Sequence, residues 1–190
     1  TGRFRINLYK QRNSVSLSAR LIFENIPSIK ELCLPEWIND HIMKPQGLIL
    51  IAGLPGNGKA ATISALVDVI NSTRKCNIVT LEDPIEYLHK HKKSNVNQRE
   101  IGIDTESFSA GLKHVTRQGA DVIVISELRD TESIVMALNA AETGHLVLSA
   151  MTSLNTITAL DRIINIFPQN QQPQIRIQLA DTLLLVLSQK

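Results

Sequence analysis

The sequence predicts an α/β fold with a mostly parallel sheet, and two patterns indicate it. From Gly47 onward, short apolar runs alternate with longer amphipathic segments, as expected for strands connected by helices on both faces of a parallel sheet. A glycine-rich segment, Gly53–Lys59, stands between the first such run and the first amphipathic segment. Ahead of this region, residues 3–22 alternate apolar and polar side chains, which predicts a small antiparallel unit before the main sheet.

In that first unit, Arg3–Tyr9 and Val15–Ile22 flank a polar turn at Gln11–Ser14 and predict a β-hairpin. A hairpin alone cannot bury a core, so we expect it to complete a domain that begins upstream. A connector with three prolines follows and brackets a short helical pattern that runs from Ile29 to Ile42. The domain boundary is therefore expected in this connector.

The main region has clear strand and helix signals in alternation. Buried strands are predicted at Leu48–Ala52, Asn77–Leu81, Val122–Ile125 and His145–Leu148. Amphipathic helices are predicted at Ala60–Asn71, around Phe108–Val115 with Asp104 as N-cap, and around Ile134–Ala141 with Asp130 as N-cap.

Composition limits the classes of protein that this chain can belong to. Its 190 residues are 43% hydrophobic and 20% charged, enough for one complete core and too apolar for a disordered chain. With 20 Lys+Arg and 18 Asp+Glu the net charge is +2, which disfavours nucleic acid as a partner. The longest apolar runs, Leu48–Ala52 and Leu183–Leu187, are far shorter than the roughly 20 residues of a membrane span. Two cysteines fit a reducing compartment, so the cytoplasm is expected.

The most specific signal is the Gly-x-x-x-x-Gly-Lys pattern of Gly53–Lys59, called the phosphate loop below. Glycines let backbone N–H groups turn toward a phosphate, the following helix N-terminus adds positive potential, and Lys59 reaches the terminal phosphates. The alternative is a glycine-rich turn with a solvated lysine, which the strand and helix on either side disfavour. The predicted nucleotide-binding residues are Gly53, Pro55, Gly56, Asn57, Gly58, Lys59, Ala60 and Ala61.

The residue after the lysine departs from the usual pattern. A Ser or Thr hydroxyl there is a direct ligand of the Mg²⁺ that bridges the nucleotide phosphates, and this chain has Ala60. Thr62 is a doubtful substitute because the helix rotates its side chain away from the phosphates. We therefore expect phosphate binding to be retained and metal placement to be weakened.

Acidic residues follow two predicted strands at the edge where a nucleotide would lie. Glu82, Asp83 and Glu86 come after the second strand, and Glu127 comes after the third. They are candidates for polarising water or holding Mg²⁺, with Glu82 the weaker one. The alternative for each is a solvated turn carboxylate.

A series of sequence blocks follows one order along the chain: Gly2–Asn7, Ile26–Ser28 with Leu34–Pro35, the phosphate loop, Glu82–Glu86, Val96–Glu100, Asp121–Asp130, Ala140–Leu146, and Asp161–Ile164 with Phe167–Pro168. This series resembles the secretion ATPases of type II secretion and type IV pili, in particular the pilus-retraction branch (PilT and PilU type). The absence of a four-cysteine motif before Lys190, together with the last block, favours that branch over the assembly branch.

The resemblance implies a domain organisation and a set of roles. Residues 46–190 would form a RecA-like P-loop domain truncated at its C-terminal end, residues 30–45 a linker, and residues 1–29 the last part of a small PAS-like α+β domain. ATP and Mg²⁺ are the implied cofactors, with Glu86 aligning the attacking water and Glu127 holding Mg²⁺ through a water. The implied arginines are Arg117 and Arg129 in the core and Arg3, Arg5 and Arg20 as candidates for contacts between subunits.

Departures from the family pattern concern the chemistry. Where the family has its histidine box, this chain reads Ser149–Ser153, so Thr152 replaces a histidine that contacts the γ-phosphate. His145 matches a different position and is expected to have a packing or hydrogen-bonding role. Ser126 replaces the glycine before Glu127. Losing a metal ligand and a phosphate contact, at about 2 to 4 kcal/mol each, predicts slow or absent hydrolysis.

Two functions from different classes follow. The first is a subunit of a hexameric, cytoplasmic motor, peripheral at the inner membrane, that acts on a pilus platform protein with weak hydrolysis at best. The second is an inactive nucleotide-binding paralogue that assembles with a homologous active ATPase. A nucleic-acid translocase on the same fold is disfavoured by the nearly balanced charge. The basic run His89–Lys93 is expected to be a solvated loop or a subunit contact.

Overall fold

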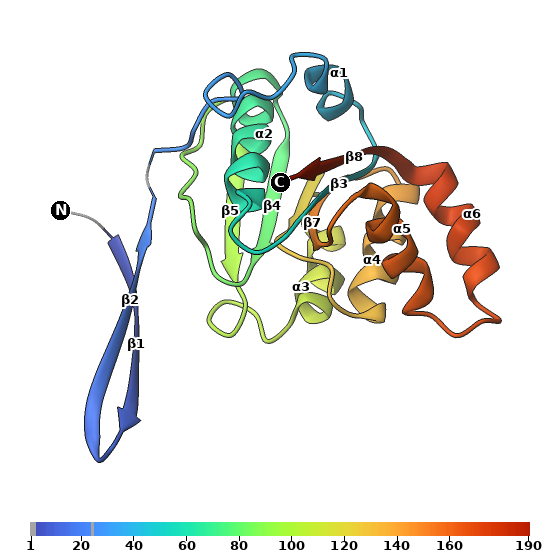
Figure 1. Ribbon diagram of the computed structural model, residues 1–190. Helices are drawn as coiled ribbons and strands as arrows, with labels where there is room; N and C mark the ends of the chain where they lie inside the picture. Colours follow the sequence, from blue (N-terminus) through green and yellow to red (C-terminus); the bar gives the residue numbers. More distant parts are fainter. Residues whose placement is uncertain (1–2, 24) are drawn as a thin grey trace.

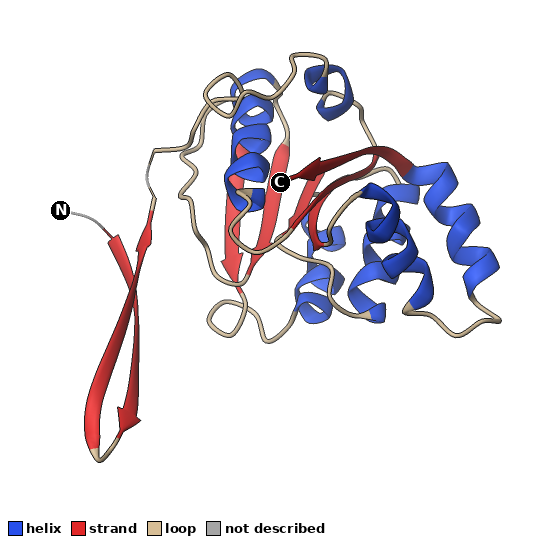
Figure 2. Cartoon of the chain, in the orientation of Figure 1, coloured by secondary structure: helices blue, strands red, loops and turns tan. Residues whose placement is uncertain are grey.

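The computed structural model describes residues 3–23 and 25–190 and confirms the predicted α/β class (Figure 1). An antiparallel hairpin precedes a six-stranded sheet whose paired strands all run parallel. Figure 2 shows helices on both sides of this sheet and the hairpin extending away from it. Among the described helices, none combines the length and the hydropathy needed to cross a bilayer.

The hairpin consists of β1 (Arg3–Gln11) and β2 (Ser14–Ile22), as predicted. Its turn residues Arg12 and Asn13 both have positive φ, 47° and 62°, as in the type I′ turns whose twist matches that of the paired strands. Just past β2, Phe23 forms a bridge with Tyr87 of the main domain, and the two rings stack at 5.3 Å between centroids. This contact connects the hairpin to the body of the molecule.

Cross-strand pairing gives the hairpin one apolar face and one polar face. Residues directly opposite each other in an antiparallel pair share a face. The polar face carries the opposed pair Arg5 and Arg20. The apolar face is exposed and consists of Phe4, Ile6, Leu8, Val15, Leu17, Ala19 and Leu21.

The main domain follows the predicted alternation of strands and helices. Its strands are β3 (Gly47–Gly53), β4 (Asn77–Glu82), β5 (Asn95–Glu100), β6 (Val122–Ile125), β7 (Leu146–Thr152) and β8 (Leu183–Gln189). Its helices are α1 (Ile38–Ile42), α2 (Lys59–Thr73), α3 (Phe108–Val115), a 3₁₀ turn η1 (Thr116–Gln118), α4 (Thr131–Glu142), α5 (Thr156–Asn165) and α6 (Gln172–Thr182).

The strand order is β5-β4-β6-β7-β3-β8, so β3 lies between β7 and β8. Side chains of the central strands β3, β4, β6 and β7 alternate between two apolar cores. One core packs α3, α4, α5 and α6 against one face, and the other packs α1 and α2 against the opposite face. Leu48 and Leu50 belong to the first core, and Ile49 and Ile51 belong to the second. This burial on both faces explains why β3 has no polar residue between Leu48 and Ala52.

All four predicted strands of the main region are present, but β7 begins at Leu146 and continues to Thr152. Strands β5 and β8 were not predicted. β5 reads Asn-Val-Asn-Gln-Arg-Glu, and its polar character reflects its position at one edge of the sheet. β8 is the second apolar run, and apolar content alone does not distinguish a buried strand from a helix.

Two local expectations change in the structure. The helical pattern of the connector yields a helix only over α1, because Cys33 has a φ of 53° and interrupts the chain before it. Asp104 is not the N-cap of α3. Its carboxylate accepts from the Glu100 N–H at 2.8 Å, and the Ser107 hydroxyl instead accepts from the Ala110 N–H at 3.1 Å.

Other local predictions are confirmed. Asp130 caps α4 by accepting from the Ser133 N–H at 2.8 Å. His145 has the predicted local role, since its Nδ1 lies 3.0 Å from the Ala140 carbonyl oxygen. In the basic run, residues 90–93 are exposed as expected, whereas His89 is half-buried. Burial lowers the pKa of His89 to about 4.

Candidate functional site

The phosphate loop connects the end of β3 to the start of α2. Gly56 and Gly58 have φ values of 88° and 78°, a conformation that side chains with a Cβ rarely adopt. Nothing lies within 4 Å of a Cβ built on either residue, so the backbone conformation is what requires glycine there. The Thr62 N–H closes the first turn of α2 by donating to the Gly58 carbonyl oxygen at 3.0 Å. The loop therefore has the strand, glycines and helix N-terminus of an anion site.

Lys59 folds back over the loop that precedes it. Its Nζ donates to the carbonyl oxygens of Gly53 and Leu54, at 2.8 and 3.1 Å. These acceptors are neutral, so a phosphate group would be a stronger partner for the ammonium group. The lysine is positioned to exchange its carbonyl contacts for a ligand's terminal phosphate.

The structure brings most of the predicted site residues to one hollow of about 380 Å³ at the carboxyl ends of the strands. The loop forms one side, and acidic and basic side chains form the other. The lining residues are Pro55, Gly56, Gly58, Lys59, Ala60 and Ala61 from the loop and α2, and Arg20, Asp83, Glu86, Tyr87, Ser126, Glu127, Arg129 and Ala150 from elsewhere.

Glu127 is held by hydrogen bonds at both carboxylate oxygens. Thr152 Oγ1 donates to Oε1, and Arg129 Nε donates to Oε2 at 2.8 Å. Burial raises the pKa of Glu127, but the hydrogen bonds from Thr152 and Arg129 and the charges of Arg129 and Lys59 outweigh it and leave the pKa lowered. The carboxylate is therefore ionised and oriented by its own chain.

Arg129 also forms an ion pair with Asp83, at 3.5 Å between Nη1 and Oδ2. Asp83 in turn is placed by its backbone N–H, which donates to the Ser126 hydroxyl at 3.2 Å. We call Asp83, Glu86 and Glu127, with Arg129 and Thr152, the acidic edge. Its carboxylates come from the segments that follow β4 and β6, two neighbouring strands.

The hairpin contributes Arg20 to the same hollow. Arg20 Nη1 lies 3.8 Å from Glu86 Oε1, and the arginine side chain is 65% exposed, so this ion pair is weak. Arg5 lies outside the hollow and forms an ion pair with Glu100 at 3.7 Å. Arg3 begins β1, and its side chain lies outside the described part of the structure. The polar face of the hairpin thus faces the acidic segments of the main domain.

Glu82 does not join the acidic edge, so its expected role as a metal ligand is not supported. Its Oε1 accepts from Thr80 Oγ1 at 2.6 Å and from Gln98 Nε2 at 2.9 Å. Burial raises the pKa of Glu82 despite these hydrogen bonds, and the neighbouring charges of Glu86 and Glu100 act in the same direction. The residue is part of the contact between β4 and β5.

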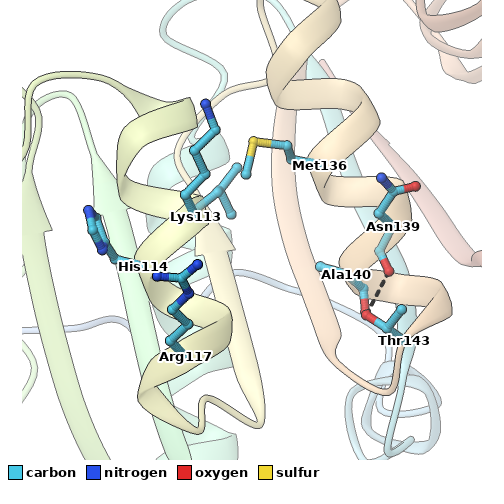
Figure 3. Close-up of a pocket in the computed structure, with 8 residues that line it drawn as sticks. Lys113, His114, Arg117, Met136, Asn139, Ala140 and Thr143 are labelled. Carbon is cyan, nitrogen blue, oxygen red and sulfur yellow. Dashed lines mark hydrogen bonds between the residues drawn. The ribbon is translucent and has the colours of Figure 1, made fainter.

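Arg117 is also separate from the hollow. It lies on η1, which precedes β6, whereas Glu127 follows that strand, so the two residues lie at opposite ends of the same strand. Figure 3 shows Arg117 near Lys113 and His114, on the side of α3 that faces α4. These residues line a second hollow, of about 480 Å³. A role for Arg117 at the phosphate loop of its own chain is therefore excluded by its position, and a role toward another subunit stays a prediction.

In the described part of the chain, no side-chain hydroxyl lies where the residue after the loop lysine would hold Mg²⁺. Ala60 has no oxygen in its side chain, and the Thr62 hydroxyl is buried and accepts from Gln189 Nε2 at 2.7 Å. Both oxygens of Glu127 are hydrogen-bonded. Within the described residues, no group of three or more His, Cys, Asp or Glu side chains is placed to hold a metal ion. Thr62 is therefore a poor substitute for the missing hydroxyl, as its position in the helix predicts.

Sequence reasoning did not single out Tyr87 and Ser126 as parts of the site. Tyr87 follows Glu86 directly, and Ser126 precedes Glu127, so their adjacency to predicted acids was the available signal. Burial raises the pKa of Tyr87, and the charge of Glu86 adds to that shift. Both residues line the hollow.

Comparison with known proteins places this chain and its fold in a family. Residues 29–190 match the family model "Type II/IV secretion system protein", and the chain belongs to that family. The fold of its main domain is RecA-like, as the resemblance implies.

Individual relatives resemble the chain over its whole length. It is 40% identical to the type IV pilus ATPase PilU of Pseudomonas aeruginosa over 100% of this chain and 50% of that protein. It is 38% identical to the type IV pilus retraction ATPase PilT of the same organism over 99% of this chain and 55% of that protein. A crystal structure of the pilus retraction motor PilT with bound ADP superposes with a TM-score of 0.97 at 46% identity, covering 100% of this chain and 55% of that one. The chain thus spans about half the length of the curated relatives it matches.

Proposed function

We propose that this chain is the nucleotide-binding part of a pilus-retraction or secretion motor subunit that binds ATP and hydrolyses it weakly. One observation carries the proposal: the phosphate loop with Lys59 faces Glu86, Glu127 and Arg129 across a single hollow. The ADP bound to the PilT structure supports it, because that protein has the same fold at 46% identity. The proposed hydrolysis is weak because Ala60 supplies no metal ligand and Thr152 occupies the position of a histidine.

The proposed chemistry uses residues of this chain. The loop N–H groups and Lys59 bind and orient the phosphates. Glu86 aligns the attacking water, and its exposed ion pair with Arg20 is weak enough to be given up for that role. Glu127 stays ionised between Thr152 and Arg129. Since those contacts occupy Glu127, the chain places a metal only through the nucleotide and water.

We also propose the larger arrangement that such a motor needs. The exposed apolar face of the hairpin fits a division into the end of a PAS-like domain over residues 1–29, a linker over 30–45 and the RecA-like domain over 46–190, because in a folded domain such a face is covered. The proposed assembly is a homo-oligomer, a hexamer, in the cytoplasm and peripheral at the inner membrane. Its proposed partner is the pilus platform protein.

Binding of a fluorescent ADP analogue to the purified full-length protein tests the proposed function. Lys59→Ala removes the only loop cation and is expected to weaken binding about 100-fold. Lys90→Ala is the matched control, because Lys90 is exposed in the basic run and does not line the hollow. Equal binding by the unmodified protein and Lys59→Ala would reject the loop as the nucleotide site.

A second candidate function is an inactive nucleotide-binding partner of a homologous active ATPase. Ala60 and the replacement at Thr152 favour it, since both alter chemistry and leave the phosphate-binding glycines in place. In that case the protein alone would bind ADP without releasing phosphate from ATP, and mixing with an active homologue would give rings that contain both chains. Native mass spectrometry of the mixture distinguishes such rings from separate ones.

A further inference from the structure

Strand β8 ends at the phosphate loop, and its last residue contacts the chain on both sides of Lys59, in the loop and in α2. In the sheet, Gln189 is the register partner of Gly53, where the loop begins. The carbonyl oxygen of Gln189 lies 3.1 Å from a Cβ built on Gly53, so a larger residue there would require this carbonyl group to shift. The sheet register therefore brings a residue from the far end of the chain to the start of the loop.

Two hydrogen bonds join Gln189 to the loop and the helix that follows it. Asn57 Nδ2, within the loop, donates to the Gln189 carbonyl oxygen at 2.9 Å. The Gln189 side chain donates from Nε2 to Thr62 Oγ1, in the first turn of α2, at 2.7 Å. Thr62 is fully buried, so this bond is shielded from water. Exchanging the amide nitrogen and oxygen would preserve the contact, because a hydroxyl both accepts and donates.

This arrangement matters more here than in a loop with a hydroxyl at position 60. A metal-bound hydroxyl would tie the start of α2 to the nucleotide, and Ala60 cannot do so. The contacts of Gln189 instead tie the same segment to the sheet. Since Lys59 lies between Asn57 and Thr62, fixing both of these residues fixes the backbone that carries the lysine.

We propose that Gln189 is a positioning residue that holds the phosphate loop in its anion-binding conformation through Asn57 and Thr62. This inference rests on the proposed nucleotide binding. Gln189 does not line the hollow and acts only through the loop. Without the hydrogen bond from the Gln189 side chain, the loop would keep all its phosphate-binding residues but would also adopt conformations that do not bind phosphate.

Two measurements on the full-length protein test this role. The first is the affinity for a fluorescent ADP analogue, and the second is hydrogen exchange of the loop amides 54–60 without nucleotide. Gln189→Leu keeps the side-chain bulk and removes the bond to Thr62, and Thr62→Val removes the partner hydroxyl. We expect each substitution to weaken ADP binding about five- to tenfold and to speed hydrogen exchange in the loop. The double variant should bind ADP no more weakly than the single variant with the lower affinity.

Matched variants separate positioning from general stability. Ser188→Ala changes the neighbouring residue, whose buried hydroxyl has no hydrogen-bond partner among the described residues, and is expected to change affinity less than about twofold. Thr62→Ser keeps the hydroxyl and should restore most of the affinity that Thr62→Val loses.

The outcomes distinguish this inference from the proposed function. If Gln189→Leu lowers only the melting temperature and leaves affinity and loop exchange unchanged, the residue is structural and the positioning role is overturned. If the losses of ADP affinity in the two single variants add fully in the double variant, the hydrogen bond between Gln189 and Thr62 is not what positions the loop. If the unmodified protein binds no ADP, the proposed function fails and this inference fails with it.

Discussion

The phosphate loop and the acidic edge face each other across one hollow, but their polar groups are occupied differently. Lys59 contacts neutral carbonyl oxygens, which a phosphate can replace at low cost. At the acidic edge, Glu127 is bonded to Thr152 and Arg129, and Asp83 is paired with Arg129. Binding a nucleotide therefore disturbs little, whereas recruiting Glu127 to a metal or a water breaks charged contacts. The difference teaches that one hollow can combine a cation that is free to change partners with carboxylates that their own chain already holds.

Breaking the loop side should give the largest effect. Gly58→Ala puts a Cβ on a residue at φ 78°, at a strain of about 1–2 kcal/mol that the loop relieves by moving its N–H groups. We expect about 100-fold weaker ADP binding, because several charge-assisted hydrogen bonds are lost together. Gly119→Ala is the matched control. Gly119 has a φ of 63°, lies before β6 at the end of the sheet away from the phosphate loop, and also has nothing within 4 Å of a built Cβ. Both variants should lower the melting temperature, and equal affinities would show that the loop conformation does not matter.

The segment after β4, which supplies part of the acidic edge, also contains His89, and this residue makes the stability of the fold depend on pH. Burial lowers the pKa of His89 to about 4 from an ordinary value of 6.5, so the unfolded chain binds the proton more readily. Stability linked to His89 is complete above pH 6.5 and is lost as the pH falls toward 4. The loss at pH 5 is about 2 kcal/mol relative to pH 8.

Urea unfolding of the unmodified protein and His89→Gln at pH 5 and pH 8 measures this term. The variant should lose less stability between the two values, because the other titrating groups are common to both proteins. Parallel losses in the two proteins would show that His89 is protonated without penalty. ADP affinity of the variant at pH 8 should equal that of the unmodified protein.

The effect of Mg²⁺ on ADP affinity should be smaller, and it tests whether the hollow places a metal ion. Since no side chain at position 60 reaches a metal, Mg²⁺ should tighten ADP binding less than about threefold in the unmodified protein. In Ala60→Ser the same addition should tighten binding about tenfold. Titrations with and without EDTA provide the measurement. A strong Mg²⁺ effect in the unmodified protein would point to another ligand.

The smallest effect is expected at the ion pair between the hairpin and the acidic edge. Arg20→Ala removes an exposed pair with Glu86 at 3.8 Å and should change the free energy of unfolding by less than about 0.5 kcal/mol. Thermal unfolding measures it, with Arg12→Ala in the hairpin turn as a surface control. A large loss specific to Arg20 would show that the hairpin depends on this contact.

The sequence predicted the features that depend on local patterns. Buried strands such as β3 and β6 are continuous apolar runs, and the glycines of the phosphate loop mark positive φ values, so both were predicted from the residues alone. β5 was missed because an edge strand can be polar, and Asp104 was misassigned because Ser107, closer to α3, competes as the N-cap.

The sequence predicts site residues that follow directly after strands. It does not predict which hydrogen bonds a side chain forms with residues from other strands. Glu86 and Glu127 lie at the hollow as predicted. Glu82 is the last residue of the strand that Glu86 follows, but its side chain is hydrogen-bonded to Gln98 and does not line the hollow. The contact of Gln189 with Thr62 joins residues far apart in sequence, and only the sheet register reveals it.

Phosphate release from Mg·ATP tests the central claim, that binding is retained and hydrolysis is weakened. The full-length protein is compared with the double variant Ala60→Ser, Thr152→His at equal concentration. The account predicts slow release by the unmodified protein and at least about tenfold faster release by the double variant, with Lys59→Ala inactive in both. Equal rates in the two proteins, abolished by Lys59→Ala, would contradict it, because the altered residues would then not limit hydrolysis.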